Sequence, residues 1–234
     1  MEETPERYGR DVVVLIPVFE PGRMLPDFVE RLSKRFERIV LVDDGSTCGL
    51  EHLEAVRPFV ERILRHAVNS GKGAALKTGL GYIGDADVVT ADADGQHSVE
   101  DIVRIASALR THREGIVLGV RAFNGHVPFR SRFGNWWTRL VFGMLTGLWL
   151  ADTQTGLRGI PSELAARVRV LPGDRYEYEI VMLADARRHA MKPLQIPIET
   201  IYTDGNPESH FSPVRDSFRI YRALFGFLLK RRDK

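Results

Sequence analysis

The first half of the sequence alternates short apolar runs, rich in β-branched residues, with segments of helical periodicity. The run from Asp11 to Pro17 is apolar at every interior position, as expected of a strand that is buried on both faces. The segment after Pro21 and Gly22 instead repeats apolar residues every three or four positions, which is the helical period. This alternation predicts an α/β fold with a mostly parallel central sheet and helices on both faces. The expected strands cover residues 11–17, 39–42, 62–65, 87–90 and 115–120.

The second half is less regular and holds no internal repeat or clear linker. The expected elements there are a short strand at 156–160, a helix at 178–190, an extended segment at 192–202 and an amphipathic helix at 214–230. We therefore predict a single domain over residues 1–212, followed by a basic amphipathic helix over residues 213–234.

Charge and composition exclude several classes of protein. A formal net charge of +2 gives no reason to expect a nucleic-acid partner, and the basic excess gathers in residues 215–234, with seven basic against two acidic side chains. Cys48 is the one cysteine, so a reducing, cytosolic setting is the simpler expectation. Residues 1–10 lack the apolar run of a secretory signal. The longest uncharged apolar stretch, residues 140–151, is shorter than the roughly 20 residues that a spanning helix needs, so we expect no membrane crossing.

Four polar clusters stand where expected strands end. They are Phe19-Glu20, Asp43-Asp44, residues 92–96 and Arg121. In open α/β sheets, ligands bind beyond the carboxyl ends of the strands. We therefore expect these clusters to line one binding site.

The segment from Asp92 to Gln96 is the most informative of these clusters. Asp92 and Asp94 can both turn toward one cation once the chain bends at Gly95, and carboxylate and amide oxygens suit Mg²⁺ or Mn²⁺. We predict a metal site formed by Asp92, Asp94 and Gln96, whose cation would bridge the oxygens of a diphosphate. An EF-hand calcium loop is excluded because its sixth position is His97 instead of glycine. The alternative is a carboxylate-rich turn that caps the next helix.

Three further motifs leave two interpretations each. Asp43 and Asp44 suit a nucleobase edge or a ribose hydroxyl, or else a helix cap. Residues 69–73 lack the spacing of an ATPase phosphate loop, yet their amides and Lys72 can meet an anion or a base; the alternative is a tightly packed helix start. Residues 152–158 contain an acid, an amide, hydroxyls and a guanidinium. They could bind a nucleobase or an acceptor phosphate; the alternative is an exposed polar loop. The scattered histidines and the single cysteine give no reason to expect a zinc site.

In residue type and in order along the chain, these motifs resemble those of family-2 glycosyltransferases of the GT-A fold, most of all the polyprenyl-phosphate, dolichol-phosphate mannose synthase-like branch. The matching pieces lie at residues 16–20, 42–46, 69–73, 92–97, 119–121 and 152–158. The resemblance covers roughly residues 11–160. It implies an enzyme that inverts the anomeric centre of a sugar taken from a nucleotide-diphosphate sugar.

The resemblance also implies roles for individual residues. For donor binding we assign Pro17, Phe19, Glu20, Asp43, Asp44, Lys72, Asp92 and Ala93. Arg121 and Arg132 are expected to face phosphates. The stretch that holds Thr155, Gly156 and Arg158 is expected beside the acceptor. Residues 197–213 resemble a loop that closes over the donor, which makes His210 a candidate phosphate contact.

The predicted reaction is transfer of the sugar to a polyprenyl (dolichyl or undecaprenyl) phosphate with Mg²⁺ or Mn²⁺. A phosphate acceptor is already anionic near neutral pH and needs arginines to position it. A saccharide or other hydroxyl acceptor, which is the alternative, needs a carboxylate to remove the proton, and Asp152 is then the candidate base. A nucleotidyltransferase is disfavoured because Pro17 to Pro21 replaces the expected glycine-rich basic loop. The non-enzymatic alternative is a scaffold that binds nucleotide-sugars.

Two stretches predict contact with a lipid surface. Aromatic residues recur at helical spacing beside arginines at 130–141, and again among the cations of the C-terminal helix. We expect a cytoplasmic protein, peripheral at the inner face of the cytoplasmic membrane. Many relatives continue into transmembrane helices, so a separate membrane partner is one alternative. Packing of both stretches on the sheet, or a homo-oligomer interface, is the other.

Overall fold

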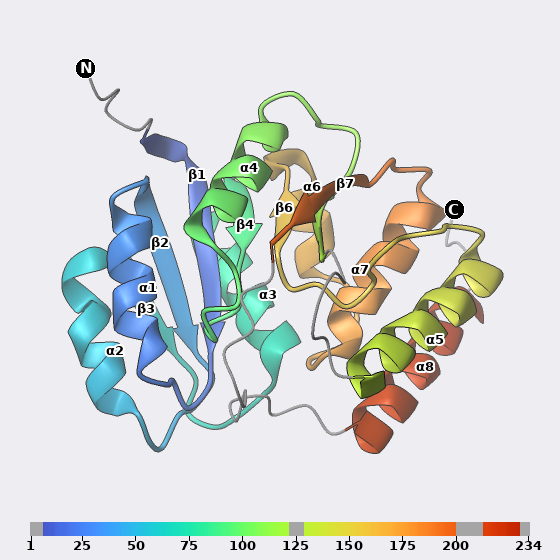
Figure 1. The fold of residues 1–234 in the computed structure, drawn as a ribbon, viewed down its shortest axis with the longest axis horizontal. Coiled ribbons are helices and arrows are strands. Elements are labelled where there is room, and N and C mark those ends of the chain that lie inside the picture. Colours follow the sequence, from blue (N-terminus) through green and yellow to red (C-terminus); the bar gives the residue numbers. More distant parts are fainter. Residues whose placement is uncertain (1–6, 122–128, 200–212, 230–234) are drawn as a thin grey trace.

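The computed structural model describes residues 7–121, 129–199 and 213–229. Its strands are β1 (Tyr8–Val18), β2 (Phe36–Asp43), β3 (Arg62–Arg65), β4 (Asp87–Thr90), β5 (Val117–Arg121), β6 (Arg158–Ile160) and β7 (Leu194–Ile198). Its α-helices are α1 (Met24–Ser33), α2 (Leu50–Val56), α3 (Lys72–Ile83), α4 (Val99–Leu109), α5 (Phe129–Thr146), α6 (Ser162–Arg169), α7 (Glu177–Arg188) and α8 (Pro213–Leu229), with a 3-10 turn at Arg57–Phe59. Figure 1 shows the sheet running across the molecule, with α5 and α8 at one end.

The seven strands form one sheet in the order β3-β2-β1-β4-β6-β5-β7. The pairs β1–β2, β1–β4, β2–β3 and β5–β7 are parallel, which confirms the mostly parallel sheet. The exception is β6, which lies antiparallel between β4 and β5. The strand predicted at 115–120 therefore does not pair with the one at 87–90.

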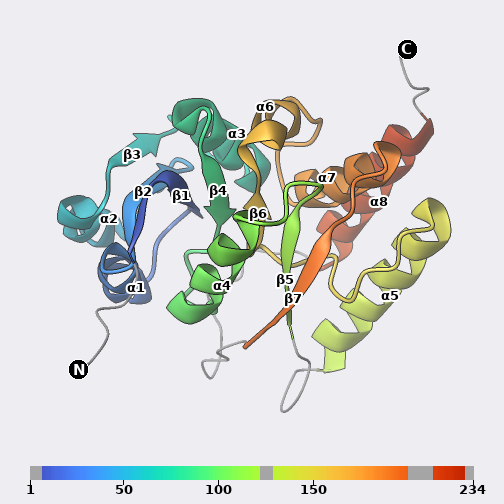
Figure 2. The same ribbon diagram turned by 90° about the horizontal axis from the view of Figure 1, so that it is seen from above.

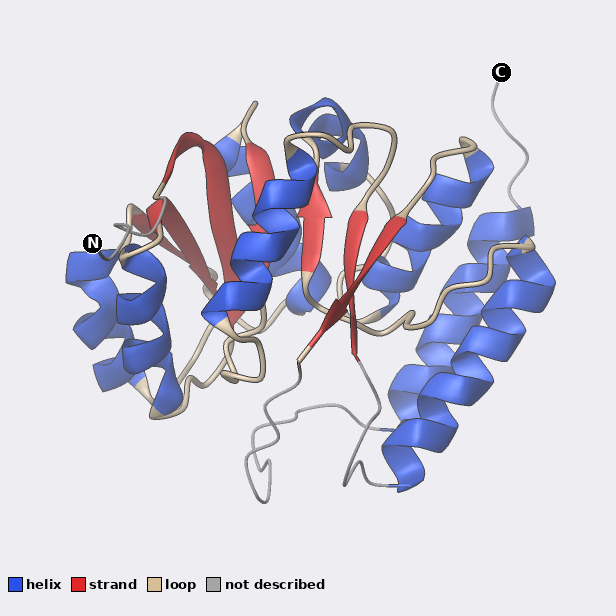
Figure 3. Cartoon of the chain, turned by 45° about the horizontal axis from the view of Figure 1, so that its top comes forward, coloured by secondary structure: helices blue, strands red, loops and turns tan. Residues whose placement is uncertain are grey.

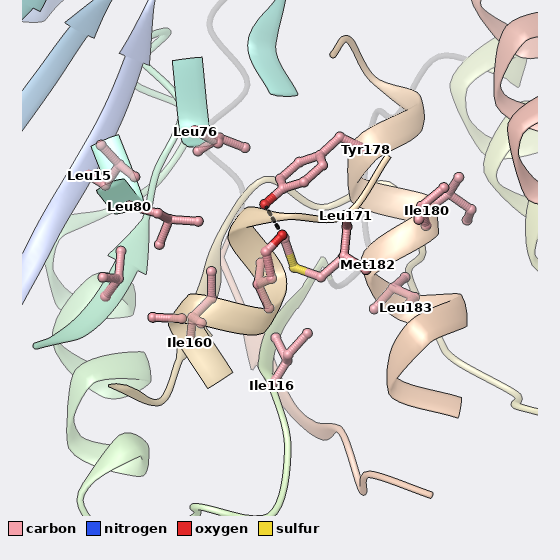
Figure 4. Packing of buried hydrophobic residues seen from close by; sticks show 14 of the residues in the cluster. Leu15, Leu76, Leu80, Ile116, Ile160, Leu171, Tyr178, Ile180, Met182 and Leu183 are labelled. Carbon is pink, nitrogen blue, oxygen red and sulfur yellow. Dashed lines mark hydrogen bonds between the residues drawn. The ribbon is translucent and has the colours of Figure 1, made fainter. Parts of the chain in front are cut away.

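Helices cover both faces of the sheet, as predicted. On one face, α1, α2 and α4 bury their apolar stripes, and on the other face lie α3, α6 and α7 (Figures 2 and 3). Strand β1 serves both cores because alternate residues point to opposite faces: Val14 and Ile16 enter one cluster, and Val13 and Leu15 the other. Figure 4 shows Leu15 in this second cluster, together with residues of α3 and α7.

The C-terminal helix α8 packs on the same side as α7. Its residues Ile220, Leu224 and Phe227 are buried in the second cluster, and Thr138 of α5 lies within hydrogen-bond distance of Tyr221, 3.2 Å between hydroxyl oxygens. The proposed division of the chain at residue 212 stays a prediction. Within the described part of the chain, no helix combines the length and the apolar character needed to cross a bilayer.

Candidate active site

The predicted polar clusters meet at one edge of the sheet because β1, β2 and β4 run in parallel. Val18, the last residue of β1, is in register with Asp43, the last residue of β2. Leu15 of β1 is in register with Thr90, the last residue of β4. The segments that follow these strands therefore emerge side by side at the carboxyl edge.

Asp92 is the centre of a charged network at this edge. Its Oδ1 lies 2.6 Å from Nζ of Lys72, and its Oδ2 lies 3.4 Å from Nε2 of His97. Burial alone would raise the pKa of Asp92, but the charge of Lys72 and the contact with His97 outweigh burial and lower it. The side chain is 29% exposed, so an anionic carboxylate is open to a ligand from solvent.

Lys72 joins Asp92 to a second buried acid, Glu179 of α7. The Nζ atom of Lys72 lies 3.1 Å from Oε1 of Glu179 as well as 2.6 Å from Asp92. Burial alone would lower the pKa of Lys72, but the two carboxylates outweigh burial and raise it. The ammonium group is therefore charged and bridges two elements that are far apart in the sequence.

Backbone geometry fixes the start of α3, which carries Lys72. Gly71 has φ of +109°, a conformation that L side chains rarely adopt. The Asp44 carboxylate accepts hydrogen bonds from the amides of Ser70 at 2.9 Å and Gly71 at 2.6 Å. A Cβ on Gly73 would stand 2.6 Å from Cβ of Tyr178, so only glycine lets α3 approach α7 this closely. This close approach brings Lys72 within reach of Glu179.

Asp94 supplies the second carboxylate of the predicted metal site. Its Oδ1 accepts the amide of Gln96 at 3.0 Å. Burial and the charge of Asp92 raise the pKa of Asp94, so the folded chain holds its ionised form at a cost. A divalent cation between the two carboxylates would relieve that repulsion.

The donor set therefore fits a cation that is shared with a substrate. Among the described residues, no group of three or more His, Cys, Asp and Glu side chains is arranged to hold a metal ion. Mg²⁺ is usually held by one or two carboxylates together with phosphate oxygens and water, and not by a cage of protein ligands. Asp92 and Asp94, with the side-chain amide oxygen of Gln96, match that pattern.

Gly156 packs directly against Asp92. A Cβ on Gly156 would lie 2.2 Å from Oδ2 and 2.5 Å from Oδ1 of Asp92. The Asp92 carboxylate therefore fits here because Gly156 has no side chain. Its carbonyl accepts the Thr90 hydroxyl at 2.7 Å, which ties the loop before β6 to the end of β4. The structure thus brings the predicted acceptor stretch onto the predicted metal site.

Asp152 and Arg121 form an ion pair. The guanidinium of Arg121 donates to both oxygens of Asp152, at 2.6 Å from Nε and 3.2 Å from Nη2, and the amide of Gln154 donates to Oδ1 at 2.9 Å. Asp152 is fully buried, whereas Arg121 is partly exposed. In this arrangement the carboxylate orients Arg121. The nearby Thr155 is also buried, and its hydroxyl accepts the amide of Leu157 at 3.2 Å.

Arg158 has a different environment from the one expected. It is buried, and its guanidinium donates to the carbonyls of Thr155 at 2.9 Å and Glu179 at 2.7 Å. Burial lowers its pKa, against the raising effect of nearby acids such as Glu179. In the described structure Arg158 therefore joins β6 to α7, and this geometry favours a structural role over contact with an acceptor phosphate.

The two acids at the end of β2, Asp43 and Asp44, also have partners. Asp43 accepts the amide of Ser46 at 2.9 Å and forms an ion pair with Arg65 at 3.1 Å. Besides the amides at the start of α3, Asp44 contacts Nδ1 of His66 at 2.7 Å. These contacts shape the loops of the predicted nucleotide pocket, and direct contact of either acid with a nucleotide stays a prediction.

Glu20 is strained at the end of β1. Its φ of +50° is unusual for a non-glycine residue, and its amide donates to the Ser46 hydroxyl at 2.8 Å. Pro17, Phe19 and Ala93 are partly buried near the same edge. The remaining two predicted residues, Arg132 (by its side chain) and His210, lie outside what the structure describes.

Glu179 is the main residue at this site that the sequence did not reveal. No local motif marks it, because its partner Lys72 is more than a hundred positions away. One signal was present: α7 is buried along most of its length, and an acid on such a helix needs a partner. Arg65 and His66, which hold Asp43 and Asp44, were also missed.

Comparisons with known proteins agree on one family. The model of the family described as glycosyl transferase family 2 matches residues 13–159. The UDP-N-acetylglucosamine–dolichyl-phosphate N-acetylglucosaminyltransferase of Methanococcus voltae is 29% identical over 217 residues, covering 82% of this chain and 86% of that protein. The polyprenol monophosphomannose synthase of Mycolicibacterium smegmatis is 25% identical over 206 residues, covering 80% and 76%.

A solved structure shares the fold. It is glucosyl-3-phosphoglycerate synthase from Mycobacterium tuberculosis, in complex with Mn²⁺, uridine diphosphate and phosphoglyceric acid. The TM-score is 0.75 at 15% identity, with 96% of this chain and 80% of that chain covered. At this identity the likeness concerns the fold alone, and it confirms the predicted α/β, GT-A architecture.

Proposed function

The chain belongs to glycosyl transferase family 2, and from this premise we propose that it transfers a sugar, with inversion, from a nucleotide-diphosphate sugar to a polyprenyl phosphate. The observation that carries the proposal is the pair Asp92 and Asp94 at the carboxyl end of β4. There a partly exposed carboxylate lies near a second acid whose ionised form it disfavours, and a cation would relieve that repulsion. The names of relatives that act on dolichyl phosphate or polyprenol support the lipid acceptor.

The residues suggest how the two anionic substrates are held. A bound Mg²⁺ or Mn²⁺ would supply charge that stabilises the departing nucleoside diphosphate. Asp92, Asp94 and Gln96 would hold it. Arg121, oriented by Asp152, would face the acceptor phosphate and offset repulsion between acceptor and donor.

The pairing of Asp152 favours a phosphate acceptor over a hydroxyl acceptor. A general base needs a free carboxylate oxygen near the proton that it removes. Both oxygens of Asp152 already accept hydrogen bonds from Arg121. A phosphate acceptor avoids the difficulty, because it is anionic near neutral pH and needs no base.

The test is transfer of label from radiolabelled donors to a solvent-extractable lipid. The purified chain is incubated with polyprenyl phosphate, Mn²⁺, and in turn UDP-glucose, UDP-N-acetylglucosamine and GDP-mannose. We expect one donor to label the lipid, and Asp92→Asn to reduce that labelling by at least about a hundredfold. Labelling of soluble saccharides alone would favour the hydroxyl acceptor. Binding of donor without any turnover would favour the scaffold.

We also propose peripheral contact with an anionic lipid surface through α8. Its outer stripe holds Phe218, Phe225 and Leu229, which are 67%, 46% and 82% exposed, with Arg222 exposed between them. Solvent-exposed aromatic side chains flanked by cations suit a headgroup layer, and the C-terminal basic excess complements anionic lipids.

Vesicle co-sedimentation tests this contact. Phe218→Ser/Phe225→Ser should reduce binding to phosphatidylglycerol vesicles, with Tyr82→Ser, an exposed aromatic on α3, as the matched control. Equal pelleting of wild type and variant would remove the membrane contact. A concentration-dependent dimer that the same variant disrupts would assign the stripe to a second copy.

A further inference from the structure

Lys72 is placed where it competes with a cation for Asp92. Its ammonium group lies 2.6 Å from Oδ1 of Asp92 and 3.1 Å from Oε1 of Glu179. We propose that Lys72 is an intramolecular competitor of the divalent cation, and that Glu179 retains Lys72 when the cation occupies Asp92. The proposal rests on the proposed function, since it takes Asp92 as a ligand of that cation.

The two carboxylates differ in access to solvent. The side chain of Asp92 is 29% exposed, whereas that of Glu179 is only 8% exposed. A cation that arrives with a substrate can therefore reach Asp92 but not Glu179. A second positive charge beside Asp92 repels Lys72, and Glu179 is the acid that can keep the ammonium paired inside the protein.

The backbone of Lys72 is fixed by its neighbours, whereas the ammonium group lies between two acids and can move toward either one. Asp44 tethers the amides of Ser70 and Gly71, and Gly73 packs against Tyr178. A response to the cation is thus a rotation of the lysine side chain, with no movement of α3. An ammonium group has three hydrogen-bond donors, so it can contact both acids at once or donate mainly to one of them.

Glu179 is then a positioning residue that acts through Lys72. Without Lys72, Asp92 loses its ammonium partner and keeps the contact with His97, so it should bind a cation more tightly. Without Glu179, Lys72 has one partner left and should hold Asp92 against the cation more strongly. A residue with a merely structural role would not give opposite signs for these two substitutions.

Direct binding of Mn²⁺ tests the proposal without any turnover. Electron paramagnetic resonance measures free Mn²⁺ in the presence of the full chain, with neither nucleotide nor lipid added. We expect Lys72→Met to lower the Kd for Mn²⁺ by about tenfold, the effect of removing one competing charge. Glu179→Gln should raise it by about threefold or more. Lys77→Met is the control, because Lys77 lies on the same helix and pairs with the exposed Asp174.

The double variant Lys72→Met/Glu179→Gln separates the two roles. It should bind Mn²⁺ as tightly as Lys72→Met, because Glu179 acts through the lysine. It also removes the unpaired buried acid that Lys72→Met leaves, so it serves if that single variant fails to fold. The proposal would be overturned if the double variant had the same Kd for Mn²⁺ as wild type. It would also be overturned if Glu179→Gln raised that Kd by the same factor whether or not Lys72 is present.

The proposed function fails in a different way. If neither wild type nor the Lys72→Met variants bind Mn²⁺ up to millimolar concentration, even with uridine diphosphate present, both the cation site and the competitor are refuted. If Mn²⁺ binding follows the expected pattern but no polyprenyl phosphate is labelled, the competitor stands and the lipid acceptor falls.

Discussion

Replacement of Gly156 by alanine tests whether the site depends on the position of one carboxylate. A Cβ there would stand 2.2 Å from Oδ2 and 2.6 Å from Cγ of Asp92. Ordinary contacts between such atoms begin near 3.5 Å, so the carboxylate must move by roughly 1 Å or more. Gly156 is not among the residues with positive φ, so alanine does not have to adopt the left-handed conformation. The carbonyl of Gly156 is held by Thr90, which leaves Asp92 as the group that yields.

The expected loss is large in activity and small in stability. A displacement of about 1 Å in a positioned group can reduce the rate by about a hundredfold, equivalent to about 2.7 kcal/mol in activation free energy. The unfolding free energy should fall by only about 1 kcal/mol, because the displaced carboxylate lies at the end of a partly exposed side chain.

The assay pairs kcat/KM for lipid labelling with a thermal melt followed by circular dichroism. Gly81→Ala, in the last turn of α3, is the matched control, since its Cβ would meet the flexible Arg169 side chain at 3.6 Å. That control should gain about 0.5–1 kcal/mol in stability and keep full activity. If Gly156→Ala keeps kcat/KM within about threefold of wild type, Asp92 does not need its observed position and the reasoning is refuted.

Four further outcomes follow from the contacts. Asp152→Asn should raise KM for polyprenyl phosphate by roughly tenfold while kcat stays within about threefold, because it weakens the orientation of Arg121; a loss of several powers of ten in kcat would instead identify a base. Asp94→Asn should stabilise the cation-free chain at pH 7, because burial and the charge of Asp92 raise the pKa of Asp94 in the folded state. That gain in unfolding free energy should vanish below about pH 3.9, where the acid is protonated in the unfolded chain as well. Urea unfolding at several pH values checks this, and an equal gain at pH 3 would contradict it. Arg113→Met should cost about 2 kcal/mol in urea unfolding, since Asp87 loses contacts at 2.5 and 2.8 Å, whereas Arg10→Met, an exposed pair with Glu37, should cost under about 0.5 kcal/mol. Tyr178→Phe should cost about 1 kcal/mol in the same assay, because its hydroxyl donates to the buried Val168 carbonyl at 2.9 Å, and an unchanged midpoint would refute that assignment.

The elements were predictable where periodicity is long and local. β1 and α1 have continuous or strictly periodic apolar patterns; β1 contains the predicted residues 11–17 and extends from Tyr8 to Val18, and α1 follows Pro21 and Gly22 as predicted. The order of the strands was not predictable in the same way. β6 has three residues, too few for a periodic signal, and its insertion between β4 and β5 depends on contacts between distant parts of the chain.

The site was predictable to the extent that its residues stand next to strand ends. Asp92 and Asp94 follow β4 directly, and their location at the carboxyl edge follows from strand direction alone. The partners of these acids could not be inferred from position along the chain. Lys72 and Gly156 meet Asp92, and Glu179 meets Lys72, only after α3, α7 and β6 have packed.

The direction of β6 explains why residues 152–156, which precede β6, lie beside the motifs that follow β1, β2 and β4. Arg158, the first residue of β6, pairs with Thr90, the last residue of β4, because the two strands are antiparallel. The amino end of β6 therefore lies at the same edge as the carboxyl ends of β1, β2 and β4. Had β6 run parallel to β4, the loop before it would have emerged at the opposite edge. Asp152 and Gly156 would then lie a strand length away from Asp92, and Arg121 at the end of β5 would lose the acid that orients it.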